Sequence, residues 1–282
     1  MKKQLRLKRA FSAILLTAVL ALCLAPSQKT VRAQQSGSKE DLTPTFWQKD
    51  PDADFPNEGR MYCAPAAVSD GLIYLARANG WKDLVPGTEK KEDQIKLVEE
   101  LGELFGTDPK KGTTVQPILV GLESYVTSKG YDLSRLDVVY YRELKGFEKF
   151  RTGSKPDLAW VRSAVRSKDT AVIFLFSRFE SKTEEDEVTR SGGHFVVAVG
   201  AGPESNEIII HNPAYESEKQ SEKKSLTFTI LDEDFIVTRI VNGSSKEFNL
   251  KGYYEVEGPG LSHKDGVTAI LEAVIVFSLK KQ

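Results

Sequence analysis

Residues 61–68 read Met-Tyr-Cys-Ala-Pro-Ala-Ala-Val, and they place a cysteine at the start of a run with helical character. Proline is tolerated in the first turn of a helix, so Pro65 indicates that the helix begins near Cys63. Peptide N–H groups and the helix dipole at such an end favour the thiolate form of a cysteine. Cys63 is therefore a candidate nucleophile, although a buried cysteine without a reactive role would fit the same pattern.

The first 33 residues have the pattern of an export signal. A basic start is followed by an apolar run from Phe11 to Leu24 and by Val31-Arg32-Ala33, which suits signal cleavage. The run is shorter than the ~20 residues of a membrane-spanning helix. We therefore expect a signal peptide over residues 1–33, rather than an anchor, and a secreted or periplasmic protein. Cys63 is then the one cysteine left after export, and a lone thiol cannot form an internal disulfide.

The rest of the chain suits one domain. Residues 34–45 are polar and contain Ser-Gly-Ser, so we expect a flexible lead-in followed by a domain over residues 46–282. The formal net charge is −1, and because the signal is basic, the exported part is more acidic than this value. No basic patch alternates with aromatic residues, so nucleic acid is not an expected partner. No second apolar run predicts membrane insertion of the mature chain, and the sequence leaves the oligomeric state open.

Helical periodicity dominates the first half of the chain, and strand patterns dominate the second. Expected helices cover about 63–79, 92–104, 115–129 and 157–166. Expected strands cover 136–141, 171–176, 194–200, 207–211, 225–231, 252–256 and 269–279. Helices followed by strands predict an α+β domain with an antiparallel sheet. The charged residues 179–189 are typical of a solvated loop, or of a mobile rim beside the histidine described next.

His194 and Asn212 extend the candidate site. Imidazole is the natural base for a thiol near neutral pH, and His194 follows two glycines and opens an apolar strand. Strands 194–200 and 207–211 are predicted to form a hairpin, which would bring Asn212 beside His194 to orient its ring. Adjacent strand residues point to opposite faces, so His211 and Asn212 cannot both enter the site. We favour Asn212, although Asn-Pro is also a common turn initiator.

An oxyanion formed at Cys63 would need hydrogen-bond donors. Candidates are the Cys63 backbone N–H and the side-chain amides of Asn57 and Gln48, each of which could also be an ordinary loop residue. No Cys-x-x-Cys or His-x-x-x-His spacing occurs, so we expect no metal and no cofactor.

Four segments together resemble the C39-like cysteine peptidases, a branch of the papain-like fold. Tyr62–Ala67 resembles the nucleophile segment of this family, and Lys111–Thr114 resembles its central Gly-Thr segment. Gly193–Gly200 is similar to the histidine strand, and Ile209–Pro213 to the strand that supplies the third residue. The resemblance spans roughly residues 62–213. It implies a papain-like α+β fold, with N-terminal helices packed on an antiparallel sheet.

The resemblance also implies an activity. It predicts an exported thiol-dependent peptidase or amide hydrolase that acts on peptides or proteins through Cys63, His194 and Asn212, with Asn57 as oxyanion donor. Three residues depart from the family pattern: Ala64 replaces a glycine, Asn57 a glutamine, and Asn212 a common aspartate. The alternatives are an inactive papain-like domain that serves as a binding module, and acyl transfer, which shares the covalent step.

Overall fold

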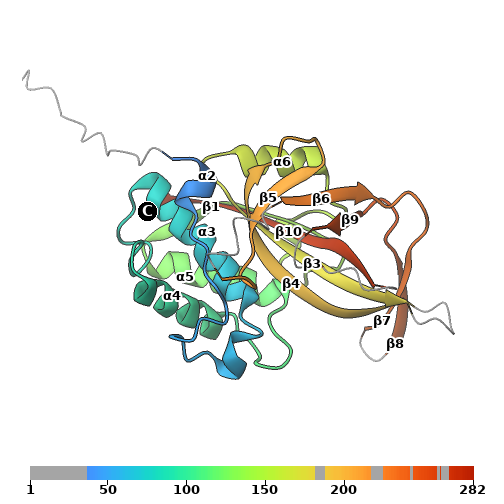
Figure 1. The fold of residues 1–282 in the computed structure, drawn as a ribbon, viewed down its shortest axis with the longest axis horizontal. Helices are drawn as coiled ribbons and strands as arrows, with labels where there is room; N and C mark the ends of the chain where they lie inside the picture. Colours follow the sequence, from blue (N-terminus) through green and yellow to red (C-terminus); the bar gives the residue numbers. More distant parts are fainter. Residues whose placement is uncertain (1–36, 182–187, 217–224, 242–243, 259–260, 262–266) are drawn as a thin grey trace, which may run out of the picture. The chain divides into compact units, whose positions relative to one another are not determined.

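The computed structural model describes residues 37–181, 188–216, 225–241, 244–258, 261 and 267–282. Helices come first along the chain and strands later (Figure 1). The helices are α2 (Lys39–Leu42), α3 (Cys63–Asn79), α4 (Lys91–Leu104), α5 (Val115–Ser128) and α6 (Leu158–Arg166), with short 3-10 turns η1 (Pro56–Gly59) and η2 (Glu148–Phe150). The predicted signal peptide, residues 1–33, lies outside the described residues.

Local signals explain where the helices begin and end. Helix α3 has Pro65 in its first turn and ends at Gly80, whose φ of 64° is the left-handed conformation that glycine adopts easily. Helix α6 begins after Asp157, whose side chain accepts a hydrogen bond of 2.7 Å from the backbone N–H of Trp160. The four longer helices lie within two residues of the predicted ranges.

The strands form a largely antiparallel sheet in the order β2-β1-β10-β3-β4-β5-β6-β9. Strand β10 also pairs with β9, at Ile270 and Glu255, so six strands close on themselves. The predicted α+β class with an antiparallel sheet is confirmed. The sheet strands are β1 (Tyr131–Tyr140), β2 (Arg151–Gly153), β3 (Ala171–Ser181), β4 (Val188–Ala201), β5 (Glu207–His211), β6 (Ser225–Ile230), β9 (Tyr254–Glu257) and β10 (Val267–Lys281).

Two apolar cores lie on opposite faces of this sheet. One joins α3, α4 and α5 to side chains such as Ile173, Phe195 and Phe277. The other joins α6 to the opposite face, including Phe174, Val196 and Phe228. Figure 1 shows α3 lying along the sheet with its first turn toward β4, and α3 and β4 are in direct contact. Burial of these faces is the main favourable term of the fold.

Three expectations differ from the structure. The expected lead-in is folded in part, because Ser38 and Asp41 form a capping box that starts α2, and Leu42 is buried. The expected loop at 179–189 is strand at both ends, because β3 and β4 extend their ladder as far as Ser181 and Val188. The sequence reading missed β2 and the hairpin β7 (Ile236–Val241) and β8 (Ser244–Asn249).

Candidate active site

Cys63 is the first residue of α3 and is half-buried. Burial raises the pKa of its thiol, because a thiolate loses solvation there. Hydrogen bonds from backbone N–H groups oppose this shift. The bond from Phe195 on β4 has the largest effect, followed by those from Ala64 and Cys63 itself at the helix end. The sulfur therefore touches the strand that carries His194, as well as the N-terminus of its own helix.

A left-handed turn precedes this cysteine. Asn57, Glu58 and Gly59 have φ values of 55°, 54° and 69°, a conformation that is costly for residues with a Cβ atom. The buried side chain of Gln48 holds the turn, since its Nε2 donates to the carbonyls of Gly59 at 3.0 Å and Arg60 at 2.9 Å. A Cβ on Gly59 would lie 1.7 Å from the Gln48 carbonyl oxygen, so only glycine fits there. The turn sets the direction in which the chain enters α3.

His194 and Asn212 meet across the β4–β5 hairpin. The ladder ends at Val197 opposite His211, and just beyond it His194 Nε2 lies 2.7 Å from Asn212 Oδ1. The backbone N–H of Ala214 donates to the same oxygen at 3.0 Å, which identifies it as the amide oxygen. An amide oxygen only accepts, so His194 carries its proton on Nε2, and Nδ1 is the nitrogen that can take a proton. The predicted hairpin and the predicted contact between these two residues are confirmed.

Burial also dominates the ionisation of His194. It lowers the pKa of the imidazole to about 4, while the Asn212 hydrogen bond opposes this shift and the positive charge of Arg178 adds to it. At neutral pH the ring is therefore neutral and able to accept a proton. His211 contacts the N-terminal segment instead, with its Nδ1 3.0 Å from the Pro44 carbonyl oxygen.

A cavity of about 150 Å³ lies where the start of α3 meets β4. Cys63 and His194 both line it, with Gly193 and Phe195 from β4. Residues 111–115, the segment that resembles the family's Gly-Thr segment, form another wall. Asn212 is buried behind His194 and does not line the cavity. The lining of this cavity thus includes a cysteine and a histidine, and the histidine ring is hydrogen-bonded to a buried amide oxygen.

Asn57 lies elsewhere. Its side chain is exposed, its Nδ2 donates to the Pro109 carbonyl oxygen at 2.9 Å, and it does not line the cavity. Gln48 is committed to the two carbonyls described above and does not line the cavity either. The structure thus places neither amide beside Cys63, because the left-handed turn directs residue 57 away from the start of the helix.

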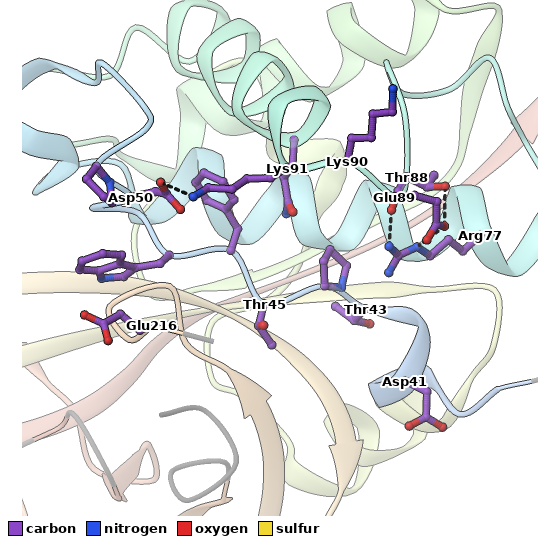
Figure 2. A pocket seen from close by; sticks show the side chains of 15 residues that line it. Asp41, Thr43, Thr45, Asp50, Arg77, Thr88, Glu89, Lys90, Lys91 and Glu216 are labelled. Atoms are coloured by element: carbon purple, nitrogen blue, oxygen red, sulfur yellow. Dashed lines mark hydrogen bonds and ion pairs between the residues drawn. The ribbon is translucent and has the colours of Figure 1, made fainter. Parts of the chain in front are cut away.

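A larger cavity of about 650 Å³ lies between the N-terminal segment and helices α3 and α4 (Figure 2). Its walls carry charge pairs, including Lys91 with Asp50 at 2.7 Å and Arg77 with Glu89 at 3.6 Å. Neither Cys63 nor His194 lines it. This cavity is larger than the one beside Cys63, but the thiol-bearing and imidazole-bearing residues line the smaller one.

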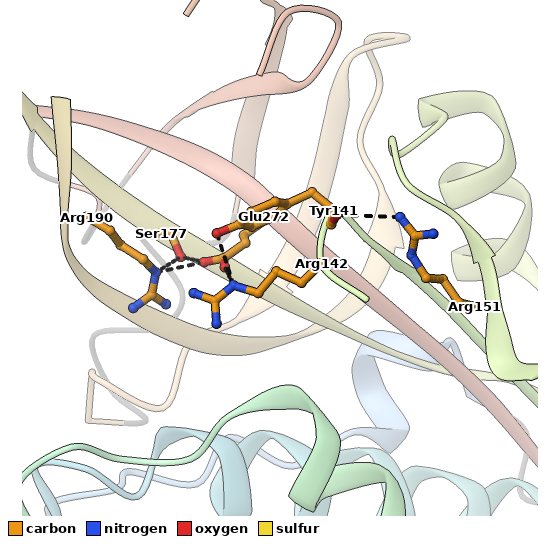
Figure 3. A network of polar contacts seen from close by, with 6 residues as sticks. All are labelled: Tyr141, Arg142, Arg151, Ser177, Arg190 and Glu272. Carbon is orange, nitrogen blue, oxygen red and sulfur yellow. Dashed lines mark hydrogen bonds and ion pairs between the residues drawn. The ribbon is translucent and has the colours of Figure 1, made fainter. Parts of the chain in front are cut away.

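The sequence reading missed a polar cluster in the wall of the smaller cavity. Glu272 is 2% exposed and is the extra residue of a bulge in β10, where Leu271 pairs with Phe176 and Ala273 with Leu175. Ser177 donates a short hydrogen bond to this carboxylate. Arg190 and Arg142 also converge on it (Figure 3). A lone acid inside the apolar run 269–279 was the available signal, because a buried charge needs a partner.

Two further observations concern the part of the chain that the structure describes. None of its helices is long and apolar enough to span a membrane. Its histidine, cysteine and carboxylate side chains form no group of three that could hold a metal ion.

Comparison with known proteins agrees with this geometry. No curated protein matches the chain. A profile of the Peptidase_C39 like family matches residues 40–236, which includes α3, the hairpin β4–β5 and all three of Cys63, His194 and Asn212. The helices packed on an antiparallel sheet agree with the papain-like fold expected from the sequence. Since the match covers well over half of the sequence, the chain belongs to the Peptidase_C39 like family.

Proposed function

We propose that the protein is an exported cysteine peptidase in which Cys63 attacks the carbonyl carbon of a peptide bond. His194 takes the thiol proton at Nδ1 and returns it to the leaving amine, and Asn212 holds the ring in the required tautomer. Water then hydrolyses the thioester and regenerates the thiol. The observation that supports this most is the 2.7 Å contact between His194 Nε2 and Asn212 Oδ1, behind a cavity that Cys63 shares.

The backbone supports the oxyanion in this proposal. The N–H of Cys63 lies at the free end of α3, where helix N–H groups have no partner within the helix. Asn57 would first have to release the Pro109 carbonyl before its amide could reach a substrate. We therefore expect Asn57→Ala to lower turnover less than tenfold, well below the ~10²–10³-fold loss that follows removal of a working oxyanion donor.

Thiol labelling tests the core of the proposal. Iodoacetamide should alkylate Cys63 at neutral pH, and His194→Ala should slow the reaction by about tenfold or more, because base assistance contributes ~10²–10⁴-fold to such steps. The matched control is His211→Gln, which changes the other histidine of the same hairpin and should leave the rate unchanged. Slow alkylation that His194→Ala does not alter would contradict the proposal.

Export belongs to the same proposal. It rests on the signal pattern of the sequence, and cleavage after Ala33 would give a mature chain that starts at Gln34. N-terminal sequencing of the protein recovered outside the cytoplasm should begin at Gln34. An uncleaved chain retained inside the cell would refute this part.

One observation favours a second function, an inactive binding module. Burial raises the pKa of the Cys63 thiol, which disfavours the thiolate at rest. In that case Cys63→Ser would leave the biological role of the protein unchanged, whereas the peptidase proposal expects this variant to abolish turnover of an unfolded protein such as reduced casein.

A further inference from the structure

The cavity beside Cys63 has a strongly positive lining. Among the residues that the structure describes, four cationic side chains and one carboxylate line it: Arg60, Lys111, Arg142, Arg190 and Glu272. Arg60 pairs with the exposed Glu58 at 3.1 Å, outside the lining. Lys111 likewise has the Asp108 carboxylate beside it, outside the lining. The two remaining described cations, Arg142 and Arg190, exceed what one carboxylate can neutralise, so a negatively charged group is the complementary ligand.

Two of these cations are held in place by buried groups. Arg190 Nε donates to Glu272 Oε2 at 2.9 Å and to Ser177 Oγ at 3.0 Å. Arg142 Nε lies 3.9 Å from Glu272 Oε1 and 3.1 Å from the Tyr141 hydroxyl. Both described contacts to Glu272 use the Nε atom, so the outer nitrogens of each guanidinium group keep their donors for another acceptor. One carboxylate shared by two guanidinium groups leaves one positive charge in excess.

The outer end of Arg190 lies directly against the backbone before His194. A Cβ atom on Gly193 would be 2.3 Å from Arg190 Nη2, so the glycine makes room for the guanidinium group. A bulge helps to bring it there, since Arg190 pairs with Phe179 and Gly192 with Arg178, which leaves Ser191 extra. The guanidinium group thus lies against the residue that precedes His194 on β4, and Arg190 lines the same cavity as Cys63.

The size of the cavity limits what can enter. Its volume of about 150 Å³ equals that of roughly five waters at ~30 Å³ each, enough for one side chain or one chain end. We propose that this cavity selects substrates that place a carboxylate beside the scissile bond, and that Arg190 and Arg142 bind this carboxylate. The inference rests on the proposed peptidase function. The carboxylate can come from an aspartate or glutamate side chain or from a C-terminus, and the test separates these sources.

Matched peptides provide the test with the mature chain. The first set is octa-alanine, acetylated and amidated at its ends, with a single glutamate at each position in turn. The second set carries glutamine at the same positions. The third has a free C-terminal carboxylate in place of the amide. Cleavage products are identified by mass spectrometry. We expect one glutamate position, or the free C-terminus, to raise kcat/KM by about tenfold or more over its neutral counterpart. Equal rates for all charged and neutral counterparts would overturn the inference.

Variants assign the preference to its residues. Arg190→Gln and Arg142→Gln should each reduce the preference to about threefold or less, while Arg190→Lys should retain part of it. Arg151→Gln is the matched control: this arginine donates to the Tyr140 carbonyl at 2.9 Å, lies near the cluster (Figure 3) and does not line the cavity. The Arg151→Gln variant should prefer the charged peptides as strongly as the parent protein does. If Arg190→Gln fails to fold by circular dichroism, Arg142→Gln decides.

Binding separates failure of this inference from failure of the peptidase proposal. Calorimetry with the Cys63→Ala protein compares the same peptides without any chemical step. Tighter binding of the charged peptides that Arg190→Gln or Arg142→Gln removes would support the carboxylate site even if no peptide is cleaved. Active enzyme that neither cleaves nor binds charged peptides better than neutral ones would refute this inference alone.

Discussion

Replacing Asn212 by aspartate keeps the shape and the acceptor oxygen at this position but adds a negative charge beside His194. Asn212 Oδ1 lies 2.7 Å from His194 Nε2, and the pKa of this imidazole is held at about 4, mainly by burial. An opposite charge within ~4–6 Å typically moves a pKa by about 1–3 units toward the charged form. We therefore expect the His194 pKa in Asn212→Asp to rise to between about 5 and about 7.

The change also alters how stability depends on pH. The folded-state pKa of His194 is below its unfolded value of 6.5, so the unfolded state binds the proton more tightly. The contribution of neutral His194 to the free energy of unfolding is therefore complete above pH 6.5, and it is lost as pH falls toward 4. At 1.36 kcal/mol per unit it amounts to at most about 3 kcal/mol. The aspartate variant should show a smaller loss of stability over this range.

Proton NMR of the imidazole ring measures this pKa directly. The chain has three histidines, and the signal of His194 is assigned by its absence in His194→Gln. The control is Asn206→Asp, the same change at the far end of β5, about 20 Å away at ~3.3 Å per residue and beyond the ~10 Å screening length. If Asn212→Asp shifts the His194 pKa no more than this control does, the assigned contact is wrong.

Three further predictions concern the thiol, one buried arginine and one glycine. Burial raises the pKa of the Cys63 thiol above its ordinary value of 9.0, so the rate of Cys63 alkylation should still be rising with pH at pH 9. A flat rate between pH 5 and 8 would instead indicate a thiolate already paired with the His194 imidazolium at rest. Arg162→Ala should lower the free energy of unfolding, measured in urea, by about 3 kcal/mol or more, because the buried guanidinium group donates to the carbonyls of residues 202, 204 and 207. The control Arg166→Ala removes an exposed arginine of the same helix and should lower it by less than about 0.5 kcal/mol. Gly59→Ala should lower the free energy of unfolding by about 1–3 kcal/mol more than Gly80→Ala does. Both glycines have a positive φ, but only at Gly59 would the new Cβ clash with a backbone atom. Equal losses for the two variants would exclude that clash.

Much of the candidate site could be predicted because it depends on local order. Pro65 and the alanines around it define the start of a helix within a few residues, and Cys63 is at that start. Two apolar segments with a short polar loop define a hairpin, and its geometry alone brings residues 194 and 212 together. The role of Asn57 was less predictable, because three left-handed residues in succession reverse the direction of the side chains before the helix.

The cationic cluster needed information that no local window contains. Glu272, Ser177 and Arg190 come from three neighbouring strands, and two of them depend on bulges at which the register shifts by one residue. A one-residue shift changes the face to which a side chain points, so an alternation pattern cannot predict where these groups lie.

The sequence by itself determined most of the order of helices and strands, the ends of the longer helices and the residues proposed as nucleophile, base and orienting side chain, since periodicity and capping act between residues a few positions apart. The tertiary structure decided the pairing of β9 with β10, the small cavity and its charged wall. Those features arise where segments far apart in the chain pack against one another, and there the shared burial of apolar faces, rather than any local preference, fixes the positions of the side chains.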